Sequence, residues 1–303
     1  YILRRLASAL PTLFLVVTLA FFLIRVAPGG PFDLEQPLEA KVMENLRRIY
    51  RLDKPLWEQY ALYLGALLQG DLGPSFYYRD FSVQELFAKG LPISIRLGFS
   101  ALVLAGVVGG ILGVLAAFRQ NTAADYAVTG FATAGLTIPT FVVAPVLQIV
   151  LGLWLAWLPV GGWNGGALRN TAMPVLVLAL PQIAVIARLT RAAMIETLRA
   201  DHIRTLRSQG LTTLTIVRHA LRSAALPVVS YLGPAAAALL TGSVVVETIF
   251  GIPGVGRYFV EGALNRDYTL VMGTVVLIAV FVIIFNLVVD IVYAILDPRV
   301  RYE

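Results

Sequence analysis

Cysteine is absent from this sequence of 303 residues, and histidine occurs only twice. Without cysteine the chain has no disulfides, no thiolate metal sites and no cysteine nucleophile. The two histidines, His202 and His219, lie in one short segment whose only carboxylate is Asp201. Two histidines need further carboxylate ligands to hold a metal ion, so the sequence predicts no metal site.

Charged residues are also scarce. They make up 14% of the chain, against about 25% in a soluble domain, whereas 58% of the residues are hydrophobic. The mean hydropathy is +0.79. Uncharged runs of about 20 residues are long enough to cross the apolar core of a bilayer as helices. The sequence therefore predicts an all-α, polytopic membrane protein surrounded by lipid, with six spans at 6–24, 97–118, 126–157, 170–187, 223–246 and 268–289.

Two of these runs carry further signals. The run 126–157 would measure roughly 48 Å as a straight helix, which is longer than one crossing needs. We therefore expect it to tilt or to break, either at Ile138-Pro139 or at Pro145. In the run 97–118, small residues that let a neighbouring helix approach closely form two overlapping small-xxx-small pairs. These are Gly106, Gly109, Gly110 and Gly113.

The segment 28–92 differs from the rest, because acids, bases and turn-forming Gly and Pro residues are frequent in it. Apolar residues at helical spacing predict helices at about 38–50 and 55–69. A disordered loop is the alternative, but abundant aromatic residues favour a small folded helical domain outside the membrane. The chain then divides into an N-terminus with the first span (1–27), this domain (28–92) and a membrane core with five spans (93–303).

Lysine and arginine fix the orientation, since short loops on the cytoplasmic side carry an excess of them. With six spans both termini share one side, and that side holds most of the arginines in short loops and at span ends. We therefore expect both termini in the cytoplasm and 28–92 outside. A cysteine at Ser75 should then react with an impermeant reagent from outside, and one at Ser208 only from inside. The net charge of +6 suits cytoplasmic arginines and does not indicate nucleic acid.

The polar stretch 199–227 holds five arginines and interrupts the apolar C-terminal two-thirds of the chain. Its apolar residues recur at intervals of three and four, the period of an amphipathic helix, and Gly210 breaks the pattern as a tight turn does. We predict two short helices, apolar on one face and basic on the other, that form a docking surface over 199–222. The predicted site residues are Asp201, Ile203, Arg204, Thr205, Leu206, Gly210, Leu211, Leu214 and Val217.

Arg188 and Arg191 follow the fourth span within the same helical stretch. Two interpretations stay open. Long arginine side chains near the end of a span extend to the membrane surface, or these two line a polar path through the membrane.

Several short motifs are spread over the whole chain. They are RVAPG at 25–29, GDLGPSF at 70–76, GGWNGGA at 161–167, ETIFGIPGVG at 247–256, GALNRDY at 262–268 and the ending Asp297-Pro298. Together they resemble the inner-membrane permease subunits of peptide ABC importers, the oligopeptide permeases among them. The resemblance runs the whole length of the chain, and the combination of motifs is specific.

The stretch 199–227 is similar to the cytoplasmic signature of these permeases, Glu-Ala-Ala-x-x-x-Gly followed by Leu-Pro. Gly210 is kept and Leu226-Pro227 stands in the distal position. Arg204, Thr205 and Leu206 occupy the first three places, where peptide-type permeases commonly have Arg-Thr-Ala, so only Leu206 departs from the pattern. The resemblance implies that this loop forms the coupling helices that sit in a groove of an ATPase subunit.

The resemblance also implies the fold of a type I ABC importer permease, a bacterial inner-membrane location and a set of partners. A second, homologous permease forms the other half of the pathway, and two cytoplasmic ATPase subunits hydrolyse ATP with Mg. A substrate-binding protein delivers the peptide from outside. The chain has no GxxxxGK[ST] motif and is expected to bind no cofactor itself. The cargo stays open between oligopeptides, dipeptides, a nickel chelate and a peptide-like antibiotic.

Two other classes of function fit the sequence less well. An intramembrane enzyme needs paired carboxylates, a Ser/His pair or a metal cluster within the spans, but their cores are uncharged and Asp290 stands alone. A channel that acts alone needs rings of like charge or a filter, and neither is evident. The sequence therefore predicts a transport subunit and not an enzyme.

Overall fold

The computed structural model describes residues 2–26, 30, 43–45, 48, 50–78, 80–240 and 244–296. Within these ranges the chain is helical without β-strands, and Pro74 and Ser82 form one isolated bridge. This confirms the predicted all-α class. The elements are α1 (Ile2–Val26), α3 (Leu56–Leu68), α4 (Val83–Phe118), α5 (Ala123–Thr137), α6 (Thr140–Leu147), the π-helix η1 (Gln148–Trp154), the 3-10 turn η2 (Asn164–Gly166), α7 (Leu168–Leu198), α8 (Asp201–Ser208), α9 (Thr213–Leu240), α10 (Val244–Ile249), α11 (Val255–Leu264) and α12 (Tyr268–Leu296).

Five helical stretches are long and apolar enough to cross a membrane: α1, α4, α7, α12 and the stretch from α9 to α10. Helix α5 and the α6–η1 segment are bent by 102° relative to each other, and they make a sixth crossing if they count as one broken span. The break falls at Ile138-Pro139, one of the two expected positions. Ile138 is extended, with φ −83° and ψ 118°, because a following proline disfavours the helical conformation.

Helix α4 begins at Val83, far ahead of the span expected at 97–118. Ser82 and Glu85 form a capping box, in which the Ser82 N–H donates to Glu85 Oε2 (2.8 Å) and the Glu85 N–H donates to Ser82 Oγ (3.3 Å). Such reciprocal bonds satisfy N–H groups that a helix start leaves open. The domain boundary expected at residue 92 therefore lies inside one continuous helix.

The membrane core is built on close packing of α4 against α7. Added Cβ atoms at Gly109 and Gly113 would lie 2.9 Å and 2.6 Å from the carbonyl oxygens of Ile183 and Ala187. Gly110 has nothing within 4 Å of such an atom. One of the two predicted small-residue pairs thus forms the contact, while the other faces away. Beside this contact lies the main apolar cluster, with residues from α4, α6, α7, α9 and α10.

Helix α3 confirms the helix predicted at 55–69, whereas most of the one predicted at 38–50 lies outside the described residues. It packs against the C-terminal half of α1 and the start of α12, in a cluster around Phe21 and Met272. Polar contacts reinforce this packing: Thr18 Oγ1 and the Tyr60 hydroxyl are 2.6 Å apart, and Arg25 Nε donates to Gln59 Oε1 (3.1 Å). That 28–92 forms a domain of its own stays a prediction.

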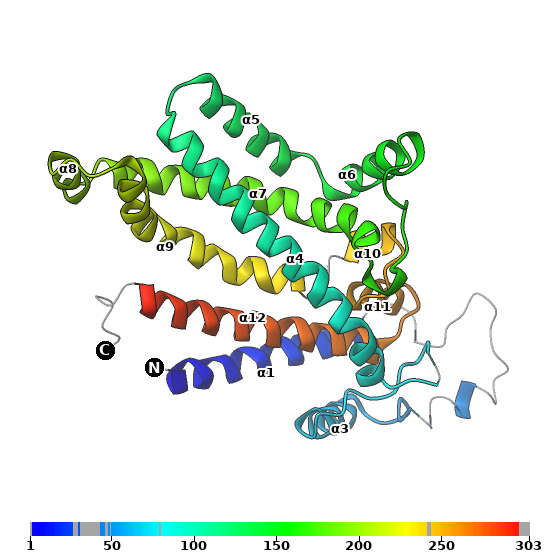
Figure 1. Ribbon diagram of the computed structural model, residues 1–303. Helices are drawn as coiled ribbons and strands as arrows, with labels where there is room; N and C mark the ends of the chain where they lie inside the picture. Colours follow the sequence, from blue (N-terminus) through cyan, green and yellow to red (C-terminus); the bar gives the residue numbers. More distant parts are fainter. Residues whose placement is uncertain are drawn as a thin grey trace.

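The elements gather at two ends of the helical bundle (Figure 1). Helix α8, the start of α1 and the end of α12 lie at one end, and α3, α10 and α11 lie at the other. The two ends of the described chain therefore share a side with the predicted docking loop, as expected from the arginine pattern.

Candidate functional site

The predicted docking loop folds as helix α8, a tight turn and the start of α9. At the end of α8 the Gly210 N–H donates to the Arg207 carbonyl (3.0 Å) and the Leu211 N–H to the Leu206 carbonyl (3.3 Å). Gly210 has a φ of +72°. These bonds form a Schellman motif, which requires a left-handed residue and so favours glycine. The predicted turn at Gly210 is thereby confirmed, but the segment after it is not a short helix, because it is the start of α9, which runs for 28 residues to Leu240.

The apolar face of α8 is turned toward the chain itself. Ile203 is 0% exposed and belongs to a cluster with Met194 of α7 and Ala220 of α9, against which Leu206 also packs. We expected this face to enter the groove of an ATPase, and for Ile203 that expectation is wrong. Because α8 is short and connects α7 directly to α9, its apolar side covers their ends and fixes α8 in place.

The exposed surface of the loop is polar and basic. Asp201, Arg204 and Thr205 are exposed, and Arg204 forms a 3.5 Å ion pair with Asp201, a type of surface contact that stabilises little. Leu211 and Leu214 are 39% and 80% exposed, and Val217 is half-buried. A partner at this surface would therefore meet arginines flanked by two exposed leucines.

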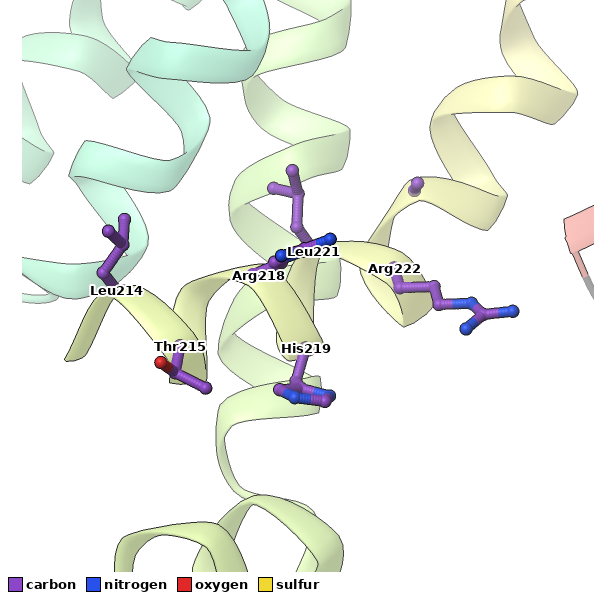
Figure 2. A pocket seen from close by; sticks show the side chains of 7 residues that line it. Leu214, Thr215, Arg218, His219, Leu221 and Arg222 are labelled. Atoms are coloured by element: carbon purple, nitrogen blue, oxygen red, sulfur yellow. The ribbon is translucent and has the colours of Figure 1, made fainter. Parts of the chain in front are cut away.

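Helix α9 extends this surface with a groove of about 660 Å³ (Figure 2). In Figure 2 the side chains of Leu214 and Leu221 point to one side of the ribbon, and those of Thr215 and His219 point to the other. The full lining is Leu214, Thr215, Arg218, His219, Leu221, Arg222 and Ala225. Apart from Leu214, these residues are missing from the predicted site, although the i, i+4 spacing of Arg218 and Arg222 puts both on one face of a helix.

Arg188 and Arg191 have different surroundings. Arg188 is exposed, whereas Arg191 donates from Nε to Asp125 Oδ1 (2.5 Å) and from Nη2 to Asp125 Oδ2 (2.7 Å). Asp125 is 1% exposed and also accepts the Asn121 N–H (2.9 Å). A polar path lined by the two arginines stays a prediction. The sequence did not indicate Asp125 as a partner, since 66 residues separate it from Arg191.

A family model for the inner membrane component of binding-protein-dependent transport systems matches residues 109–302. This range covers the crowded α4–α7 contact, the α8 loop and the α9 groove. The chain belongs to this family. The protein is therefore a multi-pass inner-membrane transport component, and its family is one of transport proteins and not of enzymes.

Relatives of this inner membrane component match along its whole length. It is 50% identical over 303 residues to the oligopeptide transport system permease protein OppB of Salmonella typhimurium, with 100% of this chain and 99% of that protein covered. It is 42% identical over 302 residues to the dipeptide transport system permease protein DppB of Lactococcus lactis, with 99% of each covered. A solved structure of the MetNI methionine ABC transporter, in inward facing conformations, shares the fold. Its TM-score is 0.60 at 18% identity, with 71% of this chain and 97% of that chain covered.

At the opposite end of this inner membrane component, two of the motifs noted in the sequence meet at Asp267, which is 0% exposed. Its Oδ2 accepts the Ser75 hydroxyl (2.5 Å) and the N–H groups of Phe76 (2.9 Å) and Tyr77 (3.1 Å). Its Oδ1 accepts the Leu270 N–H (3.0 Å), which caps the start of α12. Ser75 is also 0% exposed, so it is unsuitable as the labelling site that the sequence suggested.

The third motif at this end joins α4, α10 and α11. The Val255 N–H donates to Ser94 Oγ (2.9 Å), and the Ser94 hydroxyl donates to Glu247 Oε1 (2.6 Å). Gly254 lies close to this carboxylate, because an added Cβ would lie 2.4 Å from the Glu247 carboxyl group and would force that side chain to move. Nearby, the Tyr78 hydroxyl donates to Glu261, and burial together with this bond raises the pKa of Tyr78. Side-chain hydrogen bonds therefore join the elements at this end of the transport component, whereas the α8 end presents an exposed basic surface.

Proposed function

We propose that this chain is one permease subunit of an ATP-driven importer that carries oligopeptides across the inner membrane. The observation that carries the proposal is the exposed basic surface of α8 and early α9, on a helix fixed to its own core by Ile203. A surface that is charged, exposed and rigidly backed suits the transmission of force from a partner. The whole-length similarity to OppB supports oligopeptides as the cargo.

The assembly follows from the same proposal. Two ATPase subunits bind at the cytoplasmic end that holds α8 and hydrolyse ATP with Mg, and this chain binds no cofactor. A second, homologous permease completes the pathway, and an external substrate-binding protein delivers the cargo to the end that holds α3 and α11. Both termini are then cytoplasmic.

Charge reversal on α8 tests the docking surface. Arg204→Glu combined with Arg207→Glu should lower co-purification of the ATPase subunits by about tenfold or more, since like charges across an interface cost several kcal/mol. Helix α8 should stay folded, because Ile203 is untouched. Arg169→Glu, at the other end of α7, is the matched control and should leave co-purification unchanged. Normal co-purification of the double variant would remove α8 as the docking surface.

The cargo is tested separately. Cells that lack every other peptide permease should take up tritiated tri-alanine when this chain is expressed with its partners, and should fail to do so without it. Dipeptide uptake alone would favour the specificity in the name of DppB, and nickel uptake without peptide uptake would contradict the proposed cargo.

A further inference from the structure

The ion pair between Asp125 and Arg191 lies outside the docking surface, yet its geometry is more specific than that of the exposed pairs. Two parallel N–H···O bonds of 2.5 and 2.7 Å join a side chain that is 29% exposed to one that is 2% exposed. Bidentate pairs of this kind fix both the distance and the direction between two groups. A buried pair adds little net stability, because desolvation opposes the attraction, so its presence calls for a reason other than stability.

On one side the pair is connected to α8. Arg191 lies one helical turn before Met194, and Met194 and Ile203 are both 0% exposed in the same cluster. Packed side chains transmit small displacements because a close-packed interior has little free volume. A shift of α8 therefore moves the last turns of α7, and Arg191 with them.

On the other side the pair holds the first turn of the broken span. Asp125 lies in the first turn of α5, which runs to the break at Ile138 and then bends by 102° into α6. A cavity of about 210 Å³ lies between this break and α7, and its lining includes Phe131, Ile138, Val177 and Pro181. The broken span is thus pinned to α7 by an ion pair at its start and has free volume at its bend.

We propose that the Asp125–Arg191 pair is the strut through which a movement of α8 reaches the broken span α5–α6. The two residues are positioning residues for transport and do not touch cargo. This inference rests on the proposed coupling of α8 to ATPase subunits. It assigns to Arg191 a mechanical role in place of a polar path through the membrane.

Two spin labels measure movement on either side of the ion pair. The chain has no cysteine of its own, so each label attaches only at an introduced cysteine. One label at Ser208→Cys reports on α8, and one at Phe141→Cys, a position 59% exposed, reports on α6. The full complex with its partner permease and ATPases is reconstituted in lipid, with other reactive cysteines replaced. Spectra are compared between the nucleotide-free state and a state trapped with ATP and vanadate.

In the parent chain both labels should respond to nucleotide. In Asp125→Asn, which keeps the shape and an acceptor for the Asn121 N–H, the Ser208 label should still respond. The response of the Phe141 label should fall by about tenfold, which is within the 5- to 150-fold range typical of coupling between two sites. Arg191→Lys keeps the charge but loses the bidentate geometry, and should give an intermediate response. Arg188→Gln, one turn earlier and exposed, is the matched control and should leave both responses intact.

The outcomes separate the two proposals. If the Ser208 label of the parent chain ignores nucleotide, the proposed function fails and the strut fails with it. If the parent chain responds at both positions and Asp125→Asn and Arg191→Lys still do, the strut is refuted while the proposed function stands. Loss of the Ser208 response in both variants would show that the pair merely holds the fold together, which also refutes the strut.

Discussion

Replacement of Asp267 tests the hydrogen bonds that join the loop at 75–77 to the start of α12, at the end of the bundle where α3 and α11 lie. This carboxylate accepts hydrogen bonds from Ser75, Phe76 and Tyr77 in the loop and from Thr269 and Leu270 at the start of α12. Hydrogen bonds to a charged group contribute about 1.5–3 kcal/mol each, but they are not additive when they share one acceptor. We therefore expect Asp267→Ala to cost about 3–5 kcal/mol, as for breaking a buried charged network.

Asp267→Asn should cost less, because the amide retains one acceptor oxygen. If that oxygen occupies the Oδ2 position, the three donors of the loop keep their partner. The amide nitrogen then faces the Leu270 N–H, and two donors oppose each other, whereas the Thr269 hydroxyl can rotate to accept. One lost hydrogen bond with its desolvated donor corresponds to about 1–3 kcal/mol.

Hydrogen exchange of the backbone amides measures this cost locally. The amides of Phe76, Tyr77 and Leu270 exchange when the loop opens, and each 1.4 kcal/mol changes that opening about tenfold. Exchange over 72–82 should thus accelerate by about 10²- to 4 × 10³-fold in Asp267→Ala, and less in Asp267→Asn. Asp80→Asn, an exposed position in the same loop, is the control and should change little. Unchanged exchange in Asp267→Ala would refute the reasoning.

Three further predictions concern other parts of the chain. Gly113→Ala should lower the amount of folded protein in detergent, because an added Cβ would lie 2.6 Å from a backbone oxygen of α7, whereas Gly110→Ala, with nothing within 4 Å, should be neutral or stabilising. Gly210→Val should insert normally but reduce ATPase co-purification, because its φ of +72° strains a β-branched residue by about 1–3 kcal/mol; normal assembly would contradict this. Cysteine at Tyr77, 51% exposed, should react with an impermeant reagent from outside and cysteine at Ser208 only from inside, and the reverse pattern would invert the topology.

The features that the sequence predicted well are those with a local cause. The break at Ile138-Pro139 follows from the conformational limit that proline sets on the residue before it. The turn at Gly210 follows from a left-handed conformation that glycine adopts at little cost. The glycine pair at 109 and 113 follows from helical spacing alone, although spacing did not tell which of the two pairs would face α7.

The polar contacts between these motifs could not be predicted from the sequence, because the residues that form each contact are distant along the chain. Asp267 binds Ser75 across 192 residues, and Ser94 binds Glu247 across 153. The motifs that contain these residues were recognised as a set, but nothing in their spacing indicated that the loop at 70–76 closes on the start of α12. Such a contact is fixed by the tertiary fold and not by local periodicity.

The α8 helix shows what an amphipathic pattern does and does not specify. The spacing of Ile203 and Leu206 required that one face of the helix be covered, and the structure covers it with α7 and α9. Periodicity is the same whether the covering surface belongs to the chain or to a partner, since both remove the same apolar area from water. The exposed arginines then become the informative residues, because burial within the chain does not explain them. We therefore propose Arg204 and its neighbours as the docking residues, whereas Ile203 holds α8 against α7 and α9.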